Sequence, residues 1–287
     1  MSLKEIKIRI QSVSNTRKTT SAMKMVSSVK LRKAQQSIQY ALPYVEQLNH
    51  ILTSLSSMPQ AQSVSPLVVE REVRNVAIVC MSSDSSLCGG FNSNMIRHAK
   101  ALIEEWLRID DEPHIYPIGA KITDALAKEG YKINRAFSGL MQSRDYSKAA
   151  ELADDLMDLF TYGHLDKVII TYTHFRSAGS QHIVDEVLLP VSVPKSDTGE
   201  YAADYILEPS ATELIASLLP KVIKTRLYSA VLDSFASEQA ARVIAMQAAT
   251  ENADNLIGEL TLQYNKLRQQ AITNEILDLA AGAQNDG

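Results

Sequence analysis

The loop at positions 82–92 holds the residues of this chain that could most readily do chemistry. It reads Ser-Ser-Asp-Ser-Ser-Leu-Cys-Gly-Gly-Phe-Asn, follows an apolar run and precedes a helical pattern. A loop in this position binds phosphate in many doubly wound folds. The glycine patterns G-x-G-x-x-G and G-x-x-x-x-G-K-[ST] are both absent, and the loop contains no lysine. We therefore expect a structured surface loop there rather than a nucleotide site.

Cys88 in the same loop could be a nucleophile only if a base lay beside it. The six histidines, at positions 50, 98, 114, 164, 174 and 182, show no arrangement that marks such a base. The carboxylates Asp154, Asp155 and Asp158 follow the spacing of a solvated helix face rather than that of a metal site. We expect a free cysteine in a turn, no catalytic residue, no metal and no cofactor. A nucleotide-using enzyme built on this region stays open as an alternative that a ligand-binding assay would test.

Composition and charge restrict the class of protein. The chain of 287 residues has 45% hydrophobic and 22% charged residues and two cysteines, which fits a soluble protein in a reducing, cytosolic compartment. No apolar run approaches the length of a membrane span, and the N-terminus has no signal-peptide pattern. Charge is unevenly distributed: residues 1–57 carry nine Lys or Arg against two Glu, whereas residues 210–287 carry six basic and nine acidic side chains. Such a basic arm favours an acidic partner, either nucleic acid or an acidic protein surface.

The middle of the chain alternates between strand and helix patterns. We expect strands at 73–81, 114–118, 131–137, 167–173 and 183–190, and helices at 92–107, 120–129 and 145–162. A short loop through Ser177–Ser180 should join the last two strands. This order predicts a mostly parallel sheet with helices on both faces and one antiparallel edge, which is a Rossmann-like α/β domain.

The two ends of the chain read as long helices. Residues 221–281 contain no proline and one glycine, so one helix would be roughly 90 Å long and would need a partner along most of its length. An a/d heptad seam near the N-terminus offers that partner, although Pro43 within it should bend the helix. The seam consists of Leu31, Ala34, Ile38, Ala41, Val45, Leu48, Leu52 and Leu55. In the C-terminal helix, a row of residues with the same heptad spacing consists of Leu256, Leu260, Gln263 and Leu267. It follows an alanine-rich stretch, whose small side chains allow two helices to approach closely.

We therefore expect an antiparallel two-helix coiled coil formed by the two termini, with the α/β domain between them. The predicted segments are 1–58 for the N-terminal coiled-coil helix, 70–195 for the α/β domain and 209–285 for the C-terminal coiled-coil helix. The C-terminal helix is the longer one, so its last turns, around 269–281, should continue unpaired. A helical hairpin with no further role is the alternative reading of this pattern.

The terminal motifs resemble those of one known family, the gamma subunits of rotary F-type ATP synthases. The N-terminal motif is IQSVSNTRKTTSAMKMV at 10–26, followed by Lys-Leu-Arg-Lys-Ala at 30–34. The C-terminal motifs are SEQAARVIAM at 237–246, AATENA at 248–253 and YNKLRQQAITNEI at 264–276. Leu-Cys-Gly-Gly at 87–90, Asp204-Tyr205 and Glu208-Pro209 also match, so the resemblance covers residues 4 to 283.

The resemblance implies a non-catalytic central stalk, or rotor shaft. Its coiled coil would turn inside a hexamer of three alpha and three beta subunits, while the α/β domain would form a foot on the epsilon subunit and the c-subunit ring. Rotation would couple transmembrane proton flow to ATP synthesis or hydrolysis. The protein would lie peripherally on the cytoplasmic face of the cell membrane, reach the membrane only through the c ring, and bind no nucleic acid.

Motif matching also assigns positions for coupling and partner contact. The coupling positions are Met23, Lys24, Arg242, Gln269, Thr273 and Glu275. The basic residues expected to meet acidic loops of beta are Lys24, Lys30, Arg32 and Lys33, with Lys24 exposed. The loop around Cys88 would lie near epsilon and beta, and Tyr205 near the c ring.

This chain departs from the family pattern at two places. It has Asp84-Ser85-Ser86 where many relatives have Asp-Arg-Gly, so the ionic contact of that arginine does not carry over. It also lacks the chloroplast-type insertion with a regulatory cysteine pair, which argues against thiol control. A function of another class remains open beside the resemblance: a coiled-coil adaptor whose basic arm binds nucleic acid or an acidic protein.

Overall fold

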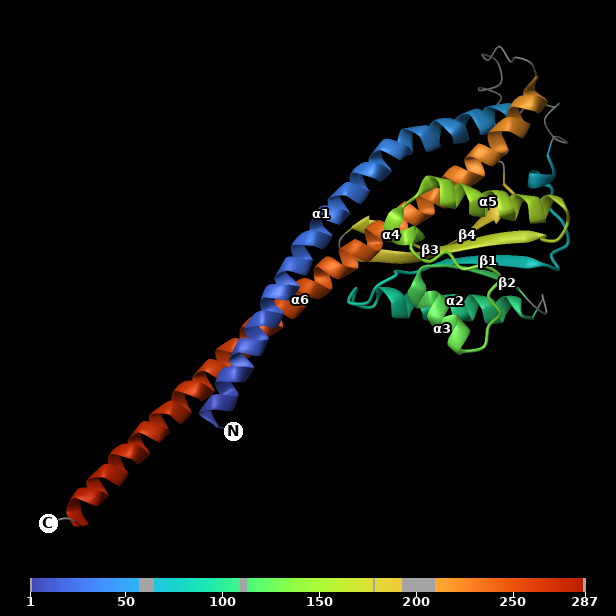
Figure 1. The fold of residues 1–287 in the computed structure, drawn as a ribbon. Helices are drawn as coiled ribbons and strands as arrows, with labels where there is room; N and C mark the ends of the chain where they lie inside the picture. The colour runs from blue at the N-terminus through green and yellow to red at the C-terminus, as the bar shows by residue number, and fades with distance from the viewer. Residues whose placement is uncertain (1, 57–64, 109–112, 178, 193–209, 286–287) are drawn as a thin grey trace. The chain divides into compact units, whose positions relative to one another are not determined.

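The computed structural model describes residues 2–56, 65–108, 113–177, 179–192 and 210–285. The chain divides into two compact units. The paired-helix unit consists of Met1–Ser28 and Arg242–Gly287, and the α/β unit consists of Val29–Ala241. Two long helices, α1 (Leu3–Ser56) and α6 (Ala211–Asn285), each contribute to both units (Figure 1).

Both long helices begin at a sequence signal known as a capping box. At the start of α1, the Glu5 amide donates to Ser2 Oγ and the Ser2 amide donates to Glu5 Oε2. At the start of α6, the Glu213 amide donates to Ser210 Oγ at 3.2 Å. α6 therefore starts ten residues before the proline-free stretch and continues through Pro220. Leu219 and Val222 are buried on either side of this proline, so tertiary packing outweighs its usual tendency to break a helix.

The α/β unit contains a sheet with strand order β2-β1-β3-β4. The strands are β1 (Val76–Met81), β2 (His114–Ile118), β3 (Lys167–Ser177) and β4 (Ser180–Leu189). β1 pairs in parallel with β2 and β3, and β4 pairs antiparallel with β3. This arrangement confirms the expected α/β fold with an antiparallel edge.

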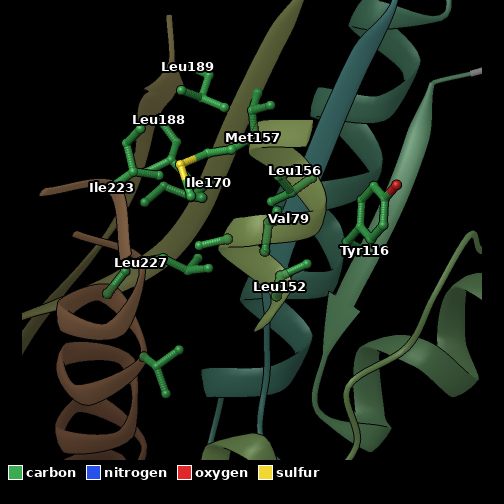
Figure 2. Close-up of a cluster of buried hydrophobic side chains, with 14 of the residues drawn as sticks. Val79, Tyr116, Leu152, Leu156, Met157, Ile170, Leu188, Leu189, Ile223 and Leu227 are labelled. Carbon is green, nitrogen blue, oxygen red and sulfur yellow. The ribbon is translucent and has the colours of Figure 1, made fainter. Parts of the chain in front are cut away.

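Helices cover both faces of this sheet (Figure 1). α2 (Phe91–Trp106) and α3 (Ala120–Lys128) lie on one face, and α5 (Tyr146–Thr161) and α6 lie on the other. Successive side chains of β1 alternate between the two layers: Ile78 and Cys80 pack with α2 and α3, whereas Val79 packs with α5 and α6. Figure 2 shows the second layer, where Leu152 and Leu156 of α5 meet residues of the sheet and of α6.

The structure corrects several predicted element boundaries. The predicted strand at 131–137 forms only isolated bridges, Ile115–Ile133 and Ile118–Phe137. The Ile115 amide donates to the Asn134 side chain at 2.8 Å, so a side-chain oxygen replaces the backbone carbonyl that a regular ladder would need. The β3–β4 hairpin is longer than predicted and reaches Ser177 and Ser180, because its polar residues continue to pair. The short elements Pro66–Val68 (η2) and α4 (Leu140–Ser143) were not predicted.

The N-terminal seam lies mainly in the α/β unit. Ala34, Leu48 and Leu52 are buried in the hydrophobic cluster that contains Ile215 and Phe235 of α6. The predicted matching row belongs to the paired-helix unit instead, where Leu260 is buried and Gln263 is exposed. The prediction that the Leu256–Leu267 row faces the Leu31–Leu55 seam was therefore wrong; the side chain of Leu55 lies outside the described residues.

Candidate functional surfaces

The first candidate surface is the helix pair of the paired-helix unit. Side chains of α1 and α6 meet across it at three polar contacts: Thr20 with Thr250, Arg17 with Asp254, and Lys24 with Gln247. As the α1 residue number rises, the α6 residue number falls, so the two helices are antiparallel. The hydroxyl oxygens of Thr20 and Thr250 lie 2.8 Å apart, and Arg17 Nη1 lies 3.0 Å from Asp254 Oδ1. This seam therefore contains two hydrogen-bonded pairs and one ion pair.

The predicted basic contacts differ in their accessibility. Lys24 is half-buried and donates to Gln247 Oε1, so the expectation of an exposed Lys24 side chain was wrong. Met23 is half-buried in the same unit. In the α/β unit, Lys30 is half-buried, whereas Arg32 and Lys33 are exposed on α1. Of these residues, Arg32 and Lys33 are the most accessible to an acidic partner.

The predicted coupling residues near the C-terminus lie on an exposed part of α6. Side chains 268–277 are all exposed, including Gln269, Thr273 and Glu275. The Thr273 hydroxyl donates to the Gln269 carbonyl at 2.9 Å, which satisfies this polar group within the helix. Ile276 is also exposed, at 60%. Within the described residues, α6 thus continues as a single helix beyond the paired segment.

Arg242 behaves differently from these C-terminal residues. Its side chain is buried, with 7% of its surface exposed. Its contacts therefore lie mainly within this chain, and partner contact through it would need part of its surroundings to move. Tyr205 lies outside the described residues.

The second candidate surface is the loop that carries Cys88. The Cys88 side chain is buried, so the predicted contact of this loop with epsilon or beta would be made by neighbours of Cys88. Its Sγ accepts from Asn92 Nδ2 at 3.1 Å and lies 3.8 Å from Ser83 Oγ. The accessible apolar residue is its neighbour Leu87, which is 60% exposed and has a positive φ of 67°. A leucine rarely adopts this backbone conformation, so the loop holds Leu87 outward against local strain.

The same loop occupies the position where related folds bind phosphate. Its oxygens accept the first three amides of α3: Asp84 Oδ1 from Ala120 at 3.0 Å, the Ser83 carbonyl from Lys121 at 3.2 Å, and Ser82 Oγ from Ile122 at 2.9 Å. Asp84 Oδ1 also accepts the Gly139 amide, at the start of α4. A helix N-terminus favours an anion, and here the anion is a carboxylate of the chain itself.

Close packing fixes this internal capping arrangement. Gly119 has a φ of 102°, and a Cβ atom there would lie 2.1 Å from the Ser82 carbonyl oxygen. Only glycine therefore lets α3 approach the loop. The sequence predicted no nucleotide site in this loop, and it did not predict that the loop caps the N-terminus of α3. No local sequence signal marks this cap, because Asp84 and Ala120 lie 36 residues apart and the residue before α3 is Gly119.

The Cys80 thiol of β1 is buried and poorly reactive. Burial raises the pKa of the Cys80 thiol from its ordinary value of 9.0 to about 12, so this thiol stays protonated at neutral pH. Across the described ranges, no group of three or more His, Cys, Asp or Glu side chains could hold a metal ion. In the same ranges, no helix has both the length and the apolar character needed to cross a membrane.

Comparison with known proteins identifies the family. The family model described as ATP synthase matches residues 2–285. The chain is 47% identical to the ATP synthase gamma chain of Phocaeicola vulgatus over 286 residues, which are 98% of this chain and 99% of that one. It is 48% identical to the gamma chain of Bacteroides fragilis over 287 residues, with the same coverage of both chains. The alternative of a nucleic-acid adaptor gains no support from these relatives.

Solved structures support the fold independently. A chain of the Euglena gracilis mitochondrial ATP synthase, in an assembly with F1 and c-ring, aligns with a TM-score of 0.68 at 17% identity and covers 98% of this chain and 93% of that one. A chain of the Tetrahymena thermophila central stalk and c-ring aligns with a TM-score of 0.60 at 22% identity, covering 80% and 99%. At this level of identity the likeness concerns the fold alone. On its near-full-length match to the family model and to the curated relatives, this chain belongs to the ATP synthase gamma chain family.

Proposed function

We propose that this chain is the central shaft of an F-type ATP synthase and that it turns inside a hexamer of three alpha and three beta subunits. The observation that carries the proposal is the long antiparallel helix pair, whose longer helix continues alone with exposed side chains at 268–277. A shaft that rotates inside a ring of subunits must be stiff along its axis. Its outer surface must also lack a patch that binds the ring tightly. Paired helices supply the stiffness, and six of the ten exposed residues on 268–277 are polar, so the apolar surface there is limited to Ala271, Ile272, Ile276 and Leu277.

The proposed role is mechanical rather than catalytic. Proton flow would turn the c ring and this chain together, and the asymmetric shaft would move the three beta sites through their nucleotide-binding states in turn. The loop after β1 fits this role, because its Ser82, Ser83 and Asp84 oxygens are engaged within the chain in capping α3. The protein would be peripheral, on the cytoplasmic face of the membrane.

We propose one partner subunit for each exposed surface of the chain. Gln269, Thr273 and Glu275 would meet the inside of the hexamer, with Met23 and Lys24 on the paired segment. Lys30, Arg32 and Lys33 would attract acidic loops of beta, where exposed ion pairs contribute only ~0–1 kcal/mol each and so permit rotation. Leu87, held outward above Cys88, would contact epsilon or beta. Segments 1–58 and 209–285 would form the shaft, and 70–195 the foot on epsilon and the c ring, with Tyr205 near that ring.

Reconstitution tests this function. The purified chain should not hydrolyse ATP, should co-purify with its alpha and beta subunits, and should restore rotation-coupled hydrolysis to them. Lys24→Glu is the matched variant: it should co-purify equally well but support less coupled activity. Failure of the wild-type chain to assemble with alpha and beta subunits would overturn the proposal, and hydrolysis by the chain alone would refute its non-catalytic role.

A further inference from the structure

The α/β unit contains an open groove beside α1, and Arg32 is the one residue of its lining that also belongs to the contacts proposed above. Its volume is about 560 Å³. One wall is a face of α1 between Arg32 and Val45, and the opposite side is formed by His174 and Phe175 of β3 and by residues 229–233 of α6. Pockets that enclose small organic ligands have volumes of about 300–1,000 Å³. The groove therefore has the size of a small-molecule site.

Six of the thirteen residues that line the groove are apolar, and the others are polar or charged, including Gln35, Gln36 and Gln39 of α1. Ile38, Leu42 and Val45 contribute from α1, and Phe175 and Leu232 contribute from the other side. Leu42 is 51% exposed, which is high for a leucine beside other apolar residues. A ligand with an apolar body would remove this surface from water, which favours binding.

The charged groups at the groove are not equivalent. The Asp233 carboxylate is engaged within the chain, because it contacts His174 Nδ1 through one oxygen and accepts the Phe175 amide through the other at 2.8 Å. Arg32, in contrast, is exposed and has no hydrogen bond or ion pair with any described residue. The available charge is therefore the positive guanidinium of Arg32, which suits a carboxylate or sulfonate.

From this combination we propose that the groove binds a small amphipathic anion, with its apolar body between Leu42 and Phe175 and its anionic group on Arg32. The ligand would touch α1, β3 and α6 at once. Because it would bind the folded α/β unit and not the unfolded chain, it would also raise the melting temperature of that unit.

Two amphipathic anions with different apolar bodies, dodecanoate and naphthalene sulfonate, test the site on the full chain. Isothermal titration should give one saturable site per chain for at least one of them, and the preferred probe shows whether the groove suits an acyl chain or an aromatic ring. Arg32→Gln should weaken binding about tenfold, since a hydrogen bond to a charged group contributes ~1.5 kcal/mol or more. Leu42→Ser should weaken it several-fold.

Matched controls lie on the same helix. Lys33→Gln removes a neighbouring exposed positive charge, and Tyr40→Ser removes an apolar side chain that is 84% exposed; neither residue lines the groove. Both should change the affinity less than twofold, and near-ultraviolet circular dichroism should show that all four variants are folded. The proposal is overturned if neither probe gives saturable binding, or if Lys33→Gln weakens binding as much as Arg32→Gln does.

Discussion

The α/β unit and the paired-helix unit use the same two helices in different ways. In the α/β unit, α1 and α6 place Ala34, Leu52 and Phe235 in a continuous hydrophobic cluster under the sheet. In the paired-helix unit, the same helices meet through hydroxyl, amide and charged side chains, with few large apolar residues buried. The first arrangement fixes one position of the helices, because close-packed side chains tolerate little displacement. The second arrangement holds the helices together mainly through polar contacts that remain partly accessible to water.

The largest effect should come from the hydrophobic core of the α/β unit. Leu48→Ala removes a buried α1 side chain from that core and should lower the free energy of unfolding by about 2–5 kcal/mol. Chemical denaturation of the two proteins measures the difference. A loss below about 1 kcal/mol would show that α1 is held no more tightly here than in the paired-helix unit.

The internal cap should have the next largest effect. Asp84→Ala removes the acceptor shared by the Ala120 and Gly139 amides and should lower the free energy of unfolding by about 1–2 kcal/mol. Asp84→Asn keeps an acceptor oxygen and is the matched control, with a smaller expected loss. Equal losses for the two variants would mean that the negative charge, rather than the hydrogen bonds, stabilises the N-termini of α3 and α4.

The buried thiol of β1 makes the α/β unit sensitive to alkaline pH. The pKa of Cys80 is raised by burial to about 12, so the stability that the protonated thiol contributes is fully present below pH 9 and is lost as pH rises toward 12. Between pH 7 and pH 10, the free energy of unfolding of the wild-type chain should fall by about 1 kcal/mol more than that of Cys80→Val. Urea unfolding of both proteins at the two pH values measures this change. A difference that does not depend on pH would contradict the assigned burial.

The smallest effect on stability should come from the polar seam of the paired-helix unit. Lys24→Glu replaces a half-buried donor to Gln247 and should cost at most about 1 kcal/mol of unfolding free energy, while clearly lowering coupled activity in the assembled enzyme. Thermal unfolding and reconstituted ATP-driven proton pumping measure the two effects separately. If the melting temperature fell as far as that of Leu48→Ala, the distinction between the two units would fail and so would the coupling role of Lys24.

The sequence by itself determined most of the secondary structure and the family. Proline-free helical stretches, Ser-x-x-Glu capping boxes and the alternation of strand and helix patterns are local signals, and local signals act before any tertiary contact forms. The absence of nucleotide-binding glycine patterns from the 82–92 loop is likewise a local signal, and the expectation of no nucleotide there stays a prediction. The terminal motifs identified the family without any structural information.

Only the tertiary structure decided how these elements are used. It placed the Asp84 carboxylate on the N-termini of α3 and α4, buried Cys88 while leaving Leu87 exposed, and gave Lys24 a partner on α6. It also assigned the Leu31–Leu52 seam to the α/β unit and the Leu256–Leu267 row to the other unit. The contacts of Asp84 and Lys24 join residues between 36 and 223 positions apart in sequence. Heptad spacing shows that a helix has an apolar face, but contact between distant segments determines which surface covers it.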